Sequence, residues 1–189
     1  EHAQVEAIKT WLKARDQAVA SVRALQALDV HKQIANRLLE PWLWHTVIVS
    51  ATEYENFFGL RRHKDAQPEI KRIADMMFEE RRKSEPRLLR QGEWHLPLVP
   101  DIEELKLRLT PEQTARVSCA RCARVSYLTH EGVRDVQEDL NMADRLINSH
   151  HLSPFEHAAY ATTNTDRPSK FTGFVQYRKQ IPDEAIFRG

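Results

Sequence analysis

Four arginines have the chemistry to bind a phosphate group or the polar edge of a pyrimidine ring. They are Arg37, Arg61, Arg178 and Arg188. A guanidinium stays charged and presents a planar fork of N–H donors, which matches the oxygens of such ligands. The simpler interpretation of any one of these arginines is a surface ion pair, so the argument depends on all four together. Together they favour a nucleotide ligand.

Two further polar residues stand next to apolar ones. Asn56 precedes two phenylalanines in an expected helix, where asparagine is a poor helix former and needs hydrogen-bond partners if it is buried. His157 ends the sequence Ser-Pro-Phe-Glu-His and opens an apolar stretch. Taken alone, this histidine is more simply a core residue than a ligand.

Histidines and cysteines raise the alternatives of a metal site and of thiol chemistry. A zinc site at His150, His151 and His157 would need a further Cys or His at ligand spacing, and none is present. Cys119 and Cys122 lie on an expected helix, without the strand-turn context of a redox motif. No glycine-rich phosphate loop occurs. The sequence therefore predicts neither a metal site nor a Rossmann or P-loop site.

Composition is that of an ordinary globular protein. The 189 residues are 41% hydrophobic and 29% charged, and the net charge is only +1, which gives no global electrostatic case for binding nucleic acid or membranes. No apolar run approaches the roughly 20 residues of a membrane span, and no signal-peptide pattern is present. Two cysteines make no disulfide framework, so a cytoplasmic protein is expected. The absence of an initiator Met suggests a missing upstream segment.

Hydrophobic spacing predicts a mixed α/β fold in which helices dominate. Helices are expected over 3–28, 30–39, 53–60, 66–83 and 136–147. Another should start at Pro111, with Thr110 as N-cap and Gln113 three residues later.

The remaining segments are expected to be extended or mixed. The apolar, β-branched run 44–50 is predicted to be a buried strand or buried helix segment, and residues 86–111, with four prolines, an extended connection. Residues 155–163 are expected to form a strand, and 171–180 a helix.

Several short segments have a combined pattern that is more specific than any one of them. Ala123–Arg124–Val125–Ser126–Tyr127, followed by Ser153–Pro154–Phe155–Glu156–His157, is similar to the opening half of the flavin-dependent (alternative) thymidylate synthases. Asn-Arg-Leu-Leu-Glu-Pro around Arg37, the segment from Asn56 to Arg61, and Ala66–Gln67–Pro68–Glu69–Ile70 are similar to the closing half. The resemblance covers most of residues 30–188 and implies such a fold with its halves in reversed order, as parts 1–100 and 101–189.

The resemblance also implies roles for individual residues. Arg61 resembles the arginine that contacts uracil and favours its ionised form, and His157 the active-site histidine beside the flavin. Arg37 resembles a substrate-binding arginine supplied by a neighbouring subunit. The implied flavin contacts are Asn56, Ser126 and Arg178, and the implied nucleotide contacts near the C-terminus are Glu184 and Arg188.

The implied reaction is reductive methylation of dUMP to dTMP by a homo-oligomer. Methylenetetrahydrofolate supplies the carbon, and NADPH reduces FAD. Two positions depart from the family: Gln176 replaces an arginine and Ile186 a serine. These departures suit a large phage-type relative that lacks its N-terminal segment here. They leave open two alternatives, a related dUMP-modifying flavoenzyme and a non-catalytic nucleotide-binding or structural subunit.

Overall fold

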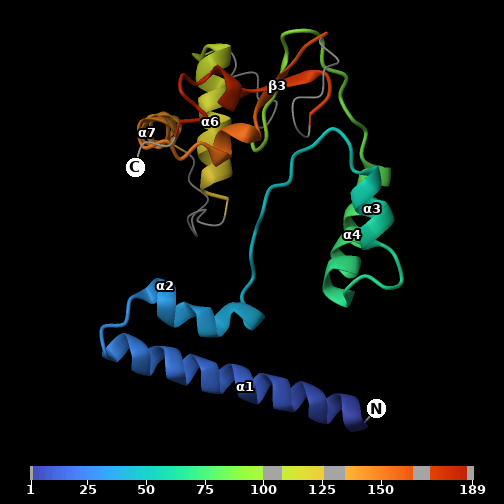
Figure 1. The fold of residues 1–189 in the computed structure, drawn as a ribbon, viewed down its shortest axis with the longest axis vertical. Helices are drawn as coiled ribbons and strands as arrows, with labels where there is room; N and C mark the ends of the chain where they lie inside the picture. The colour runs from blue at the N-terminus through green and yellow to red at the C-terminus, as the bar shows by residue number, and fades with distance from the viewer. Residues whose placement is uncertain (1, 100–107, 126–134, 164–170, 187–189) are drawn as a thin grey trace. The chain divides into compact units, whose positions relative to one another are not determined.

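Helices make up more than half of the described chain, which confirms the predicted helix-dominant, mixed α/β class (Figure 1). The computed structural model describes residues 2–99, 108–125, 135–163 and 171–186. The chain divides into two units, Glu1–Thr46 and Val47–Gly189. The predicted boundary at residue 100 lies outside the described residues and stays a prediction. Among the described helices, none is both long enough and apolar enough to cross a membrane.

The first unit is a helical hairpin. Helix α1 (His2–Ala27) agrees with the predicted helix, and it is followed by α2 (Lys32–Ala35) and the 3₁₀ helix η1 (Asn36–Trp42). Pro41 lies inside η1, one residue before its end, so the helical segment continues slightly beyond the expected stop.

The segment that joins the two units is neither a strand nor a helix, so the prediction of a buried strand or helix over 44–50 is wrong. Trp44 is fully exposed and Val47 is largely exposed, whereas Ser50 is buried. A β-branched apolar run forms a strand only where a neighbouring strand accepts its hydrogen bonds, and the described ladders pair other residues.

The second unit begins with a pair of helices, α3 (Glu55–Arg61) and α4 (Pro68–Lys83). Phe58, the buried residue of α3, meets Phe78 of α4 edge-on, with ring centroids 5.3 Å apart. Arg62 donates from Nε to Asp75 Oδ1 over 2.9 Å and lies on the Phe78 ring. A second ion pair, from Arg81 Nη2 of α4 to Glu55 Oε1 of α3 over 2.7 Å, also joins the two helices.

The core of the second unit surrounds α6 (Pro111–Ala123), which packs against α7 (Val136–Asn148). The predicted cap of α6 is confirmed: Thr110 Oγ1 accepts from the Gln113 N–H over 3.1 Å, and the Gln113 side chain accepts from the Thr110 N–H over 2.9 Å. Buried Asp139 of α7 accepts from Arg121 Nε of α6 over 2.9 Å. This buried ion pair joins the two helices.

A small antiparallel sheet completes the second unit, in the order β1 (Trp94–His95), β2 (Ala159–Ala161), β3 (Phe174–Gln176). The predicted strand over 155–163 is confirmed only for β2, because the 3₁₀ helix η2 (Ser153–Glu156) precedes it. The predicted helix over 171–180 is wrong for β3, and only η3 (Tyr177–Gln180) is helical. Val175 pairs with Tyr160, so β3 is stabilised by a partner distant in sequence.

Candidate functional site

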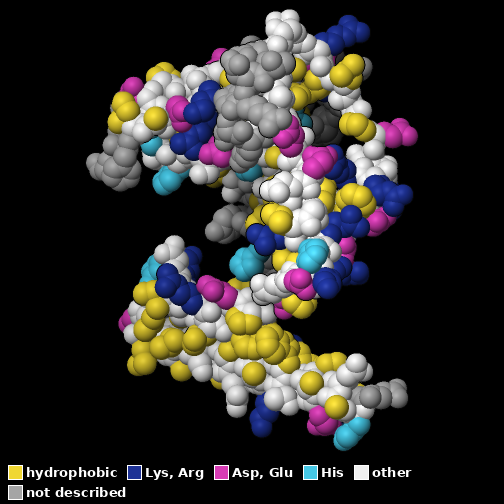
Figure 2. Space-filling model, turned by 45° about the vertical axis from the view of Figure 1, so that its right-hand side comes forward, with side chains coloured by type: hydrophobic (Ala, Val, Ile, Leu, Met, Phe, Trp, Pro, Cys, Tyr) yellow, Lys and Arg dark blue, Asp and Glu magenta, His cyan; other side chains and the backbone are white. Residues whose placement is uncertain are grey.

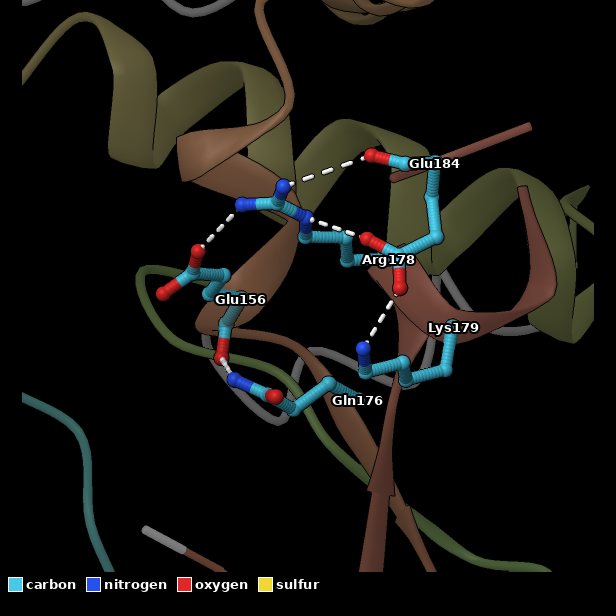
Figure 3. Close-up of polar contacts among 5 residues, drawn as sticks. All are labelled: Glu156, Gln176, Arg178, Lys179 and Glu184. Atoms are coloured by element: carbon cyan, nitrogen blue, oxygen red, sulfur yellow. Dashed lines mark hydrogen bonds and ion pairs between the residues drawn. The ribbon is translucent and has the colours of Figure 1, made fainter. Parts of the chain in front are cut away.

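Three predicted site residues lie near the junction of the sheet and the short 3₁₀ helices. Arg178 is in η3, Glu184 is in the turn that follows it, and His157 directly follows η2. Figure 3 shows the polar contacts of this region, which we call the Arg178 cluster and define as Glu156, Gln176, Arg178, Lys179 and Glu184.

The guanidinium of Arg178 holds two carboxylates. Its Nη1 donates to Glu156 Oε1 over 2.5 Å, and its Nε donates to Glu184 Oε2 over 2.8 Å (Figure 3). A longer contact of 3.4 Å joins Nη2 to the backbone oxygen of Glu184. Arg178 therefore connects η2, η3 and the C-terminal turn, and it directly contacts one other predicted site residue, Glu184.

Charge within the cluster is balanced, with two cations and two carboxylates. Lys179 Nζ donates to the other carboxylate oxygen of Glu184 over 2.5 Å. The hydrogen bonds from Lys179 and then Arg178 lower the pKa of Glu184, and those to Glu184 and Glu156 raise the pKa of Arg178. The cluster is thus a self-compensated network.

Gln176 occupies the position where the family resemblance expects an arginine. Its side chain is buried, and Nε2 donates to the backbone oxygen of Glu156 over 2.9 Å. A neutral amide satisfies this acceptor without adding a third cation to a balanced network. The departure from the family pattern therefore has a structural explanation in this chain.

His157 lies beside a cavity. Its Nδ1 is 3.1 Å from Ser50 Oγ, and Ser50 lines a cavity of about 450 Å³. The cavity has aromatic walls and polar edges; its lining includes Ser50, Thr52, Tyr54, His95, Phe171 and Phe174.

Two hydrogen bonds hold the same region together, one between distant segments and one within a single segment. The Thr172 N–H donates to Thr52 Oγ1 over 2.9 Å, and Tyr54 Oη donates to the Val49 oxygen over 2.9 Å. A cavity of this size, lined by aromatic side chains and a few hydroxyl groups, suits a planar ring that has a polar edge.

Two predicted residues lie on α3, which begins at the cavity. Tyr54 lines the cavity and directly precedes α3, so Asn56 is within one turn of the cavity wall. Arg61 ends the same helix, about 7.5 Å beyond Asn56 at 1.5 Å per residue. Both residues are exposed, and Arg61 borders a separate hollow with His63 and Asp65. The apolar run 57–60 that precedes Arg61 suggests a buried stem for this side chain, but the stem is not buried, because Phe58 supplies the buried contact of α3.

The remaining three predicted residues lie outside the described part of the second unit. Arg37 is exposed on η1 of the first unit. Ser126 and Arg188 lie outside the described residues, so their predicted roles stay predictions.

Several residues of the cavity were not predicted from the sequence. Ser50 and Thr52 belong to an irregular segment, and their partners His157 and Thr172 are more than 100 residues away along the chain. In the Arg178 cluster, the sequence assigns no role to Glu156 of the Ser-Pro-Phe-Glu-His motif, although it accepts the shortest hydrogen bond of Arg178. A spacing pattern reveals contacts within one helix or turn, and these contacts are of neither kind.

Comparisons with known proteins add no assignment. No protein-family model, no curated protein and no solved structure matches the chain.

Proposed function

We propose that this chain is a flavin-dependent thymidylate synthase-type protein that catalyses reductive methylation of dUMP to dTMP. Methylenetetrahydrofolate would supply the carbon and NADPH the reducing equivalents, with FAD as cofactor. The observation that carries the proposal is the contact between Arg178, Glu156 and Glu184. It joins the segment ending in His157 to the C-terminal segment, the two parts from which the resemblance expects one site.

The residues around the cavity are compatible with a flavin ring. Aromatic side chains line it, and so do Ser50 and Thr52, whose hydroxyl groups are polar. When bound, the flavin would supply the hydride that the reaction needs. Ser50 would fix the orientation of the His157 imidazole through the 3.1 Å contact, and the aromatic walls would exclude water.

Arg178 would act in this site by positioning. Because both carboxylates of the cluster already engage it, its contribution is to hold Glu156, and therefore the adjacent His157, in place. Arg61 and Asn56 would supply contacts to substrate and flavin from the ends of α3.

A second candidate function is a non-catalytic nucleotide-binding or structural subunit. The specific observation in its favour is the same balanced network, since a guanidinium that already holds two carboxylates has lost much of its capacity for a phosphate. Ile186 adds to this, because its hydrocarbon side chain cannot donate a hydrogen bond to a nucleotide.

Titration of the purified chain with FAD, followed by absorbance and fluorescence, tests the proposal. Wild-type protein should bind FAD, and Ala51→Trp, which fills the cavity, should weaken binding at least tenfold. Ala66→Trp is the matched control, because Ala66 lines the hollow beside Arg61 instead. A wild-type chain that binds no flavin would exclude the enzyme and leave the structural subunit, and equal loss in both variants would reject the cavity as the flavin site.

A further inference from the structure

Helix α1 carries an exposed apolar stripe. Val5, Ile8 and Leu12 recur at intervals of three and four residues and are all exposed, and Val19 continues the same face seven residues after Leu12. Figure 2 shows hydrophobic side chains gathered along α1. A heptad spacing of this kind is typical of a helix that packs against another helix.

The hairpin of the first unit does not cover this stripe. Helix α1 packs against η1 through the Trp11 and Trp42 rings, whose centroids are 5.4 Å apart, and through contacts that bury Val22. Val22 and Ala35 are the buried hydrophobic residues among the described residues of this unit. So small a buried core does not stabilise a unit of this size, so a further partner for the stripe is expected.

Charges beside the stripe indicate which partner and which direction. Lys9 and Asp16 are seven residues apart, and they therefore lie on the same edge of the stripe, with opposite charges. In a parallel pair of α1 helices, like charges would occupy the same level. In an antiparallel pair with the two-fold axis between residues 13 and 14, Ile8 would face the partner's Val19, and Lys9 would lie beside the partner's Asp16. Arg15, which interrupts the stripe between Leu12 and Val19, would face the partner's Leu12, and its apolar stem would cover that side chain while the guanidinium reaches solvent.

We propose that α1 pairs with α1 of a second copy of this chain, antiparallel, through the stripe of Val5, Ile8, Leu12 and Val19. The two-fold symmetry makes each contact occur twice, including the Lys9–Asp16 pair. The local ion pairs of these residues, Lys9 with Glu6 and Asp16 with Arg15, are exposed and contribute little, so they do not oppose the rearrangement. The inference is independent of the proposed function.

Sedimentation velocity on the full chain over 1–100 μM gives the first test. We expect a reversible dimer, and Ile8→Gln should raise its dissociation constant by roughly a factor of ten to a hundred, since two copies of the side chain leave the interface. Ile34→Gln is the matched control, because Ile34 is 60% exposed and Ile8 is 59% exposed within the same unit. A monomer at 100 μM, or equal effects of both substitutions, would overturn the proposal.

A charge exchange tests the antiparallel direction. Lys9→Asp and Asp16→Lys should each weaken the dimer by roughly tenfold, and the double variant should restore it. Within one helix these residues are about 10 Å apart, so they cannot compensate for each other in a monomer. Gln17→Lys, on the face of α1 opposite the stripe, is the control and should leave the dimer unchanged. A double variant no tighter than the single ones would reject the pairing, with circular dichroism confirming that all variants keep their helix content.

Discussion

Replacing Arg178 by methionine separates a structural role of the Arg178 cluster from a ligand-binding one. Methionine keeps most of the apolar stem and removes the guanidinium, so both carboxylates lose a donor. Glu184 keeps its contact to Lys179, whereas Glu156 loses its ion pair with Arg178. The substitution therefore probes the link between η2 and η3 and leaves part of the C-terminal turn intact.

The magnitude follows from the exposure of the three side chains. Arg178 and Glu156 are each 28% exposed and Glu184 is 17% exposed, so the pairs are neither fully solvated nor fully buried. Exposed ion pairs contribute about 0.2–1 kcal/mol each, and hydrogen bonds to charged groups in drier surroundings about 1.5–3 kcal/mol. Weighting toward the exposed value, we expect a loss of about 1–2 kcal/mol in the free energy of unfolding, or about 2–8 °C in Tm for a chain of this size.

Thermal and urea unfolding, followed by circular dichroism, measure this loss directly. Arg61→Met is the control, because an exposed arginine at the end of α3 should change the stability by less than about 0.5 kcal/mol. Equal stability of wild type and Arg178→Met would refute the structural role. If that result came with weaker binding of dUMP or FAD, Arg178 would be a ligand contact instead.

Three further predictions follow from the site and its surroundings. Arg61→Ala should raise the dissociation constant for dUMP by about tenfold, measured by titrating the flavin spectrum, whereas Arg72→Ala on α4 should leave it unchanged. Equal dissociation constants in the wild type and Arg61→Ala would mean that Arg61 does not contact dUMP. The pKa of Glu184 in the folded chain lies below its ordinary value of 4.5, so its stabilising contribution is present above about pH 4.5 and is lost as the pH falls through the lowered pKa. The midpoint of urea unfolding, plotted against pH, should therefore fall less steeply on the acid side in Glu184→Gln than in wild type. Burial raises the pKa of Cys119 and raises that of Cys122 to about 11, so both thiols should react slowly with a disulfide reagent at pH 8 until urea unfolds the chain. Replacement of both cysteines by alanine should change any turnover by no more than a few-fold. Fast labelling of the native chain would contradict the burial of these thiols.

Local signals predicted the helices well. The cap of α6 requires only Thr110, Pro111 and Gln113, and these residues interact within four positions of one another. Helices α1 and α4 likewise follow from apolar spacing alone. The predictions that failed concern segments whose conformation depends on distant partners. The run 44–50 contains the β-branched residues that are typical of a strand, but a strand also needs a neighbouring strand to pair with. The segment 174–176 has such a neighbour in β2 and forms β3.

The candidate site divides along the same line. Arg178 and Glu184 are only six residues apart, so a sequence motif can include both, and in the structure they form an ion pair. The fold, and not the sequence, shows that Glu156 contacts Arg178, 22 residues later in the chain. It likewise shows that Ser50 contacts His157, 107 residues later. Residue type explains why a guanidinium can bind an anion, but the fold decides which anion is within reach. In this chain the nearest anions to Arg178 are two of its own carboxylates, and any phosphate would have to compete with both. That competition makes positioning the better-supported role for Arg178, and it makes the cavity beside His157 the place where ligand binding should be sought first.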